Sequence, residues 1–161
     1  MKYVWSFSLF DVKTKKVSPE DVIEVAEICI NLLRIKLKSI HYSLGPTKEV
    51  STTKEVADFI KETAKKKWPV DYFPIDGELL GDDVSLFLHY HSPFRNNPCS
   101  LSVSIYSHSR AWLKAPKAKK KKFNEMFAEL KRALGVKDEN VDHDTEYEEM
   151  YGKLGKDGFI I

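Results

Sequence analysis

The chain has 161 residues and a formal net charge of +2 at pH 7, and its only cysteines are Cys29 and Cys99. This small net charge points to no class of partner, and two isolated cysteines without metal-ligand spacing are expected to be reduced thiols of a cytoplasmic protein. No run of about 18 apolar residues is present, and Met1-Lys2 is not followed by the apolar stretch of a secretory signal. We therefore expect neither export nor a membrane span, and one domain over residues 1–161.

The N-terminal part predicts a strand followed by a helix. Residues 3–9 alternate large apolar and other side chains, which indicates a strand with an aromatic core face. After a polar connection over residues 11–16, Ser18-Pro19-Glu20-Asp21 combines an N-cap serine, a proline at the first helical position and acidic residues in the first turn. Apolar residues at helical spacing then continue to Leu33.

A second strand and a second helix are predicted next. Ile40, Tyr42 and Leu44 alternate and indicate a strand that ends at Gly45-Pro46. Thr52 with Glu55 three residues later is a capping-box pattern, and the helix that it begins should end at Trp68-Pro69. The aromatic and then turn-like segment 71–82 is expected to hold a short edge strand.

Two successive runs of strict two-residue alternation predict the centre of the sheet. Large apolar side chains occupy every second position over Val84–Tyr90 and again over Leu101–Ile105. The intervening segment 92–99 holds two prolines and two asparagines, residues that favour turns and end strand pairing. We expect these runs to form an antiparallel hairpin with a long loop.

The C-terminal part predicts a third helix and an acidic tail. Apolar residues at spacings of three and four run from Phe123 to Leu134, and Gly135 is a helix C-cap. The tail over residues 137–161 is expected to form a short helix at Thr145–Leu154, and residues 159–161 either add a last strand or stay disordered. The fold class is therefore α+β (or α/β): a single-domain two-layer sandwich with a mixed sheet of about 4–6 strands, three main helices and a short C-terminal helix.

Charge is distributed in two blocks. A basic block at or just before the start of the third helix is the candidate anion-binding site: Lys117, Lys119, Lys120, Lys121 and Lys122. Because a helix N-terminus disfavours clustered cations, we expect an anion to balance it, which could be nucleic-acid phosphate, an acidic partner or the acidic tail of this chain. That tail supplies candidate partner-binding residues: Asp142, Asp144, Glu146, Glu148 and Glu149.

A second candidate partner surface follows the hairpin. Tyr106, His108, Arg110 and Trp112 share one parity with Ser102 and Ser104, and Tyr, Arg and Trp are frequent interface hot spots. Because aromatic residues at a strand end are also common in cores, both interpretations stay open.

Histidines raise the question of a metal site. With a loop centred between Pro93 and Ser100, His91 would face Ser102 and His89 would face Ser104. His108 would then lie on the order of 13 Å from His89 at about 3.3 Å per strand residue, too far for one zinc ion. We expect no metal and no cofactor.

One segment resembles an enzyme motif. His41-Tyr42-Ser43-Leu44 is similar to the signature of the two-histidine phosphoesterases, in which two such strands share acid–base work on a phosphodiester. The second copy fails, because His89-Tyr90-His91 has histidine where the hydroxyl belongs. An enzyme of this type acting on RNA or cyclic phosphodiesters is the first alternative, and a sequence-nonspecific nucleic-acid binder using the lysine block is the second.

Five stretches carry a resemblance to a family: Tyr3-Val4-Trp5-Ser6-Phe7, Asn31-Leu32-Leu33, Lys48-Glu49-Val50-Ser51, Asn97-Pro98 and Leu101–Ile105. Their order over about residues 1–135 resembles that of the small α/β immunity proteins encoded beside bacterial polymorphic toxins. The resemblance implies a cytosolic, non-enzymatic protein that neutralises one cognate toxin by covering or distorting its active site. We therefore expect a protein partner, for which the resemblance implies a cognate toxin, and no catalytic residues.

Overall fold

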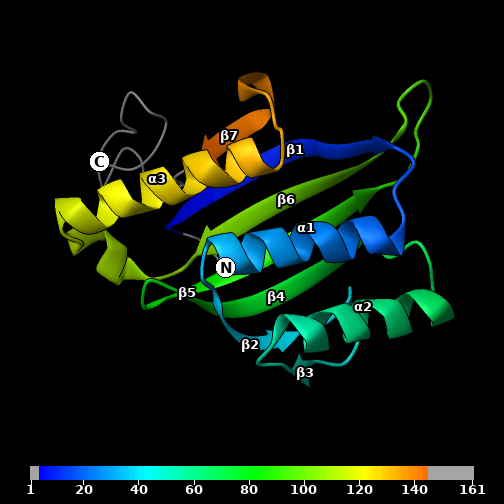
Figure 1. Cartoon of the computed structure of the whole chain (residues 1–161), viewed down its shortest axis with the longest axis horizontal. Coiled ribbons are helices and arrows are strands. Elements are labelled where there is room, and N and C mark those ends of the chain that lie inside the picture. Colours follow the sequence, from blue (N-terminus) through cyan, green and yellow to red (C-terminus); the bar gives the residue numbers. More distant parts are fainter. Residues whose placement is uncertain (1–3, 145–161) are drawn as a thin grey trace.

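The structure is a computed structural model that describes residues 4–144. A seven-stranded antiparallel sheet in the order β3-β2-β4-β5-β6-β1-β7 carries three helices on one face (Figure 1). The helices are α1 (Pro19–Leu32), α2 (Thr53–Lys66) and α3 (Lys117–Ala133), and two short 3-10 helices are η1 (Arg110–Lys114) and η2 (Asp138–Asn140). The strands are β1 (Trp5–Lys15), β2 (Lys36–Ile40), β3 (Lys48–Glu49), β4 (Tyr72–Leu79), β5 (Asp82–His91), β6 (Cys99–Ser107) and β7 (Val141–Asp144).

The predicted α+β class with three main helices is confirmed, whereas the predicted sheet needs correction. The sheet is antiparallel throughout rather than mixed, and it has seven strands rather than 4–6. The additional edge strands β3 and β7 are short and polar, so they carry no alternation that a sequence pattern could detect. The predicted helix at Thr145–Leu154 and the last strand at residues 159–161 lie outside the described residues.

The central hairpin is confirmed, but its predicted register was wrong by two residues. β5 pairs with β6 so that His89 stands opposite Ser102 and His91 opposite Ser100. The reason lies in the loop, where Phe94 and Asn97 form an antiparallel bridge around a two-residue turn. Turn length fixes hairpin register, and this turn is centred one residue earlier than the midpoint between Pro93 and Ser100 that the prediction assumed.

Three strand boundaries also differ from those predicted. β4 is not a short edge strand, because its eight residues pair with β2 and β5 on its two sides. Pro74 of β4 has no backbone N–H, and in a strand the N–H and the carbonyl of one residue point to the same side. The Pro74 carbonyl accepts a hydrogen bond from the His41 backbone N–H at 3.1 Å, so the missing donor would face His41, where β2 has already ended. β2 stops at Ile40 rather than at Gly45, and β1 continues through a register shift to Lys15, over the segment expected to be a connection.

Three of the predicted helix boundaries are confirmed, and α2 ends at Lys66, just before the predicted Trp68-Pro69. Ser18 forms a capping box with Asp21 at the start of α1, and the Thr52 hydroxyl accepts the backbone N–H of Glu55 at the start of α2. α3 ends before Gly135, whose φ of 64° is the left-handed conformation that glycine adopts without strain.

Aromatic side chains join α3 to the sheet. The Trp5 ring of β1 lies 5.9 Å from Trp112, 5.6 Å from Phe123 and 5.8 Å from Phe127, measured between ring centroids. Each buried aromatic or aliphatic side chain of this size contributes about 1.5–3 kcal/mol, so this cluster is a main source of stability. Within residues 4–144, none of the helices is long and apolar enough to span a membrane.

Leu88 and Val103 are directly paired on the core face of the hairpin. Replacing Leu88 by Asp should unfold the domain, because a buried unpaired carboxylate costs several kcal/mol against a total stability of roughly 5–15 kcal/mol. Circular dichroism melting measures this effect. His91→Asp, an exposed position on the same strand, should melt within a few degrees of wild type. A Leu88→Asp protein with unchanged Tm would refute the assignment of this face to the core.

The strand β7 lies at the sheet edge beside β1, and Asp138 ahead of it forms an ion pair with Lys131. Truncation after Val136 removes this strand and should lower the Tm by about 2–4 °C for each kcal/mol lost. A chain ended after Asp144 keeps β7, so the difference between the two truncations isolates its contribution. Equal melting temperatures for both truncated chains would show that β7 adds no stability.

Candidate partner-binding surface

The sheet face opposite the helices is uncovered by any helix in the described part of the chain (Figure 1). Strand side chains alternate, so the partners of the core residues point to this face. It is rich in serines from β1 and β6, of which Ser8 and Ser104 bond each other at 2.9 Å between their hydroxyls. Towards β5 and β4 the serines give way to rings: Tyr72, Phe87, His89, His91 and Tyr106.

Four of these rings form a continuous strip, which we call the aromatic strip: Tyr72, Phe87, His89 and His91. The His89 ring is stacked on Tyr72 at 5.5 Å, on Phe87 at 6.0 Å and on His91 at 5.7 Å, measured between ring centroids. The angles between these ring planes are 28°, 20° and 14°. Tyr72, Phe87 and His89 are half-buried and His91 is exposed, so the strip is ordered by its own packing yet remains accessible.

The strip holds His89 in the neutral form. Burial lowers the pKa of His89 below its ordinary value, the neighbouring His91 lowers it further, and Asp71 opposes the shift. At neutral pH the middle of the strip is therefore an uncharged aromatic surface.

Polar groups border the strip on its β2 side. The Ser85 hydroxyl donates to Asp76 Oδ1 at 2.6 Å, and the Ser39 hydroxyl approaches Asp76 Oδ2 at 3.4 Å. Because both oxygens of this carboxylate contact hydroxyls of neighbouring strands, Asp76 is a structural tie across β2, β4 and β5.

A cleft of about 210 Å³ lies beside this tie, lined by residues of β4 and β5 together with Lys38 and His108. Lys38 Nζ donates to Asp83 Oδ1 at 2.7 Å and lies 3.5 Å from Glu78 Oε1. The hydrogen bond to Asp83 is the main cause that raises the pKa of Lys38. With Asp76 included, three carboxylates and one lysine give this border an acidic character.

The predicted surface over Tyr106, His108, Arg110 and Trp112 does not form one face. β6 ends at Ser107, so strand parity cannot extend to the residues that follow. Tyr106 lies on the uncovered face with its ring 5.2 Å from Phe87, and His108 and Arg110 are exposed. Trp112 is 0% exposed in the aromatic core, which corrects its assignment as a partner-binding residue.

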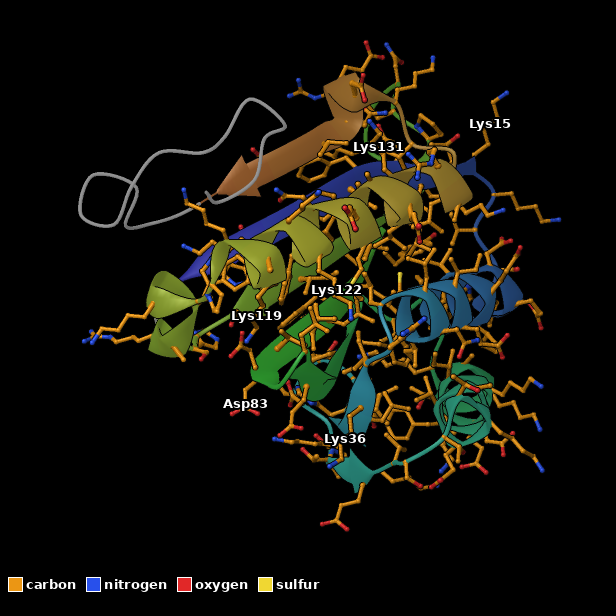
Figure 2. All side chains as sticks on the ribbon, turned by 60° about the vertical axis from the view of Figure 1, so that its left-hand side comes forward. Lys15, Lys36, Asp83, Lys119, Lys122 and Lys131 are labelled. Atoms are coloured by element: carbon orange, nitrogen blue, oxygen red, sulfur yellow. The ribbon has the colours of Figure 1, made fainter. Side chains whose placement is uncertain are left out.

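The lysine block begins α3 as predicted, on the helix side of the molecule (Figure 2). Its Lys119 forms a 3.0 Å ion pair with the buried Asp82 of β5, and Lys120 Nζ lies 5.9 Å from the Trp112 ring centroid. An acidic residue of the chain therefore does balance part of the block, although it comes from β5. The exposed members of the block are Lys117, Lys121 and Lys122.

The first acidic residues of the C-terminal segment lie away from the exposed lysines that begin α3. Asp138 pairs with Lys131 at the opposite end of α3 from Lys119 (Figure 2), and Asp142 is exposed on β7 opposite Ser8. Asp144 is the last residue of β7. The predicted partner-binding residues Glu146, Glu148 and Glu149 lie outside the described residues.

The phosphoesterase-like motif is not on a strand. β2 ends at Ile40, although the backbone N–H groups of His41 and Ser43 still donate to the Pro74 and Tyr72 carbonyls of β4. Ser43 has a φ of 41° and Leu44 is 98% exposed, so the chain leaves the sheet at the end of the motif. Tyr42 packs on Phe59 at 6.1 Å, as a structural role requires. His41 is half-buried.

The remaining candidates for chemistry are the histidines and the two cysteines. No group of three or more His, Cys, Asp or Glu side chains in the part of the chain described could hold a metal ion. Cys29 and Cys99 are buried free thiols, and burial raises the pKa of Cys29 to about 12, which keeps it protonated and unreactive.

Comparisons of this chain with protein-family models, curated proteins and solved structures found no match.

Sequence analysis missed the aromatic strip, although one signal was present. Phe87 occupies a polar-parity position between Ser85 and His89, where the alternation of β5 calls for a polar side chain. Tyr72 and Phe87 become neighbours only through the pairing of β4 with β5, which the sequence alone did not predict.

The lowered pKa of His89 makes stability depend on pH. The unfolded chain binds this proton more tightly than the folded one, so stability is full above an unfolded pKa of about 6.5 and falls as pH drops through that value. His89→Phe keeps an aromatic ring in the strip but cannot be protonated, so its Tm should fall less than that of wild type between about pH 7.5 and 5. His91→Gln should also reduce the fall, because His91 adds to the shift. Identical pH dependence in all three proteins would contradict this origin.

Proposed function

We propose that this chain is a non-enzymatic, immunity-like protein that neutralises a cognate bacterial toxin in the cytoplasm by direct binding. The partner docks on the uncovered sheet face, with the aromatic strip at its centre. The observation that carries this proposal is the strip itself, an ordered set of half-exposed rings on a face that no described helix covers.

The chemistry of this face suits a protein partner. Interface centres are enriched in aromatic residues and depleted of charge, and binding surfaces rich in tyrosine and serine combine rigid contact area with adaptable hydrogen bonds. Here the strip, with a neutral His89 at its centre, is bordered by polar groups of β4 and β5, whereas Ser102 and Ser104 of β6 beside it are buried. Such an arrangement provides an apolar centre and a polar rim.

The charges favour a protein over nucleic acid at this face. The border of the strip carries three carboxylates, Asp76, Glu78 and Asp83, and one lysine, Lys38. This excess of negative charge would repel phosphates. The lysine block lies on the helix side, and two of its members are engaged within the chain by Asp82 and Trp112. Nucleic-acid binding therefore receives less support from the structure than protein binding.

Sequencing of the neighbouring locus, followed by co-expression with the toxin domain that the proposal requires there, tests the proposal. The chain should restore growth, and the purified proteins should form a complex. Phe87→Ala combined with His89→Ala should weaken binding by about 30-fold or more, because a hot spot contributes about 2 kcal/mol or more. Asp58→Ala, an exposed change on α2 on the other side of the molecule, is the control.

Three results would overturn this proposal: a neighbouring locus without a toxin gene, a toxin that kills equally in the presence of the chain, or hydrolysis of a cyclic phosphodiester that His41→Ala abolishes. Melting curves of the double variant separate lost contact from lost folding. If the Tm of the double variant falls below the assay temperature, the single variant His89→Glu is measured instead. This substitution places a charge in the strip at a half-buried position.

A further inference from the structure

We infer that the tip of the β5–β6 hairpin, residues 92–98, is a preorganised anchor that a concave, carboxylate-bearing site on the protein partner receives. This inference rests on the proposed function and specifies the chemistry of the partner. It adds to the aromatic strip a second contact, which differs from the strip in shape and charge.

The tip projects from the end of the sheet. All seven of its residues are exposed, and the loop between β5 and β6 extends beyond the helices at the upper right of Figure 1. The tip continues directly from His91, the exposed end of the aromatic strip. A partner seated on the strip therefore reaches the tip without crossing another element.

The tip is ordered by its own hydrogen bonds. The Phe94 N–H donates to the Asn97 carbonyl at 3.2 Å, and the Asn97 N–H donates to the Phe94 carbonyl at 2.9 Å. Pro93 and Pro98 flank this closed turn and restrict the backbone on both sides. A loop fixed in this way loses little conformational freedom on binding, which is the advantage of preorganisation.

Arg95 occupies a backbone position that favours glycine. Its φ is 53°, and it is the first of the two central residues of the turn, where a positive φ is characteristic of a type II′ turn with glycine at that position. Non-glycine residues in this region are strained, and five others in the described chain share a positive φ: Asp11, Lys15, Arg34, Ser43 and Leu80. The strain at Arg95 supports the inference only together with the exposure of this side chain and of Phe94. An arginine is thus held at the apex where the turn itself would prefer glycine.

The two apical side chains define what the partner must offer. Phe94 is 66% exposed, and the guanidinium carbon of Arg95 lies 5.2 Å from the centroid of its ring. Arginine is among the commonest hot-spot residues, an aromatic side chain fills a pocket, and the guanidinium pairs with a carboxylate in bidentate geometry. Residues 92–98 contain no acidic side chain, so the complementary site has apolar walls and a negative charge.

The test measures the affinity of the toxin domain encoded beside this gene for two tip variants. Phe94→Ala and Arg95→Gly should each lower the affinity by at least about tenfold in calorimetric titrations. Arg95→Gly should simultaneously keep or raise the Tm, because glycine relieves the strained φ. A purely structural arginine would not give these opposite effects on binding and stability.

Matched controls change the same chemistry elsewhere. Leu44→Ala removes another exposed apolar side chain, outside the strands of the sheet, and Arg95→Glu is compared with Lys61→Glu, an exposed charge reversal on α2. The controls should bind within about twofold of wild type, whereas Arg95→Glu should bind more weakly than Arg95→Gly, because it places a carboxylate against a carboxylate.

The outcomes separate this inference from the proposed function. If wild type binds the toxin and the strip variants weaken binding while both tip variants bind normally, the inference is overturned and the proposed function stands. If affinity falls only in tip variants that also lose Tm, the tip acts on folding and the inference is again overturned. If wild type does not bind the toxin, the proposed function fails and the inference with it.

Discussion

The register of β5 against β6 is the constraint on which the rest of the structure depends. The short turn closed by Phe94 and Asn97 sets this register, and Leu88 therefore stands beside Val103 on the side of the helices. A slip of one residue would move every apolar side chain of a strand to the opposite face. The same register places His89 on the uncovered face, so core and candidate surface follow from one turn.

The sequence predicted the helices and the central hairpin well because their signals are local. An N-cap serine, a capping-box threonine and a C-terminal glycine act within one turn of helix, and strict alternation acts within one strand. The edge strands β3 and β7 were missed because they are defined by backbone pairing with β2 and β1. The central position of β4 was missed because Asp76-Gly77 is typical of a turn, although both residues pair with β2 and with β5 inside the sheet.

The candidate surface was less predictable than the fold, because its residues come from separate strands. Trp112 was assigned to a surface by extending the parity of β6, but the chain leaves the sheet after Ser107 and turns this side chain into the core. Tyr72 and His89 are 17 positions apart in the sequence and meet only through the β4–β5 register. Phe87 alone carried a local signal, as a large apolar ring at a position of polar parity.

Rigidity links the aromatic strip to the hairpin tip. In the strip, stacking already restricts the rings, and in the tip, two backbone hydrogen bonds already close the turn. Ordering an interface side chain costs about 0.5–1.5 kcal/mol, so a surface ordered before binding keeps that free energy available for affinity. The strained φ of Arg95 works in the opposite direction, since it lowers stability without helping the fold. The proposed binding surface therefore combines order before binding with a residue that its turn disfavours, and this combination is expected where contact with a partner, rather than stability, selects the side chains.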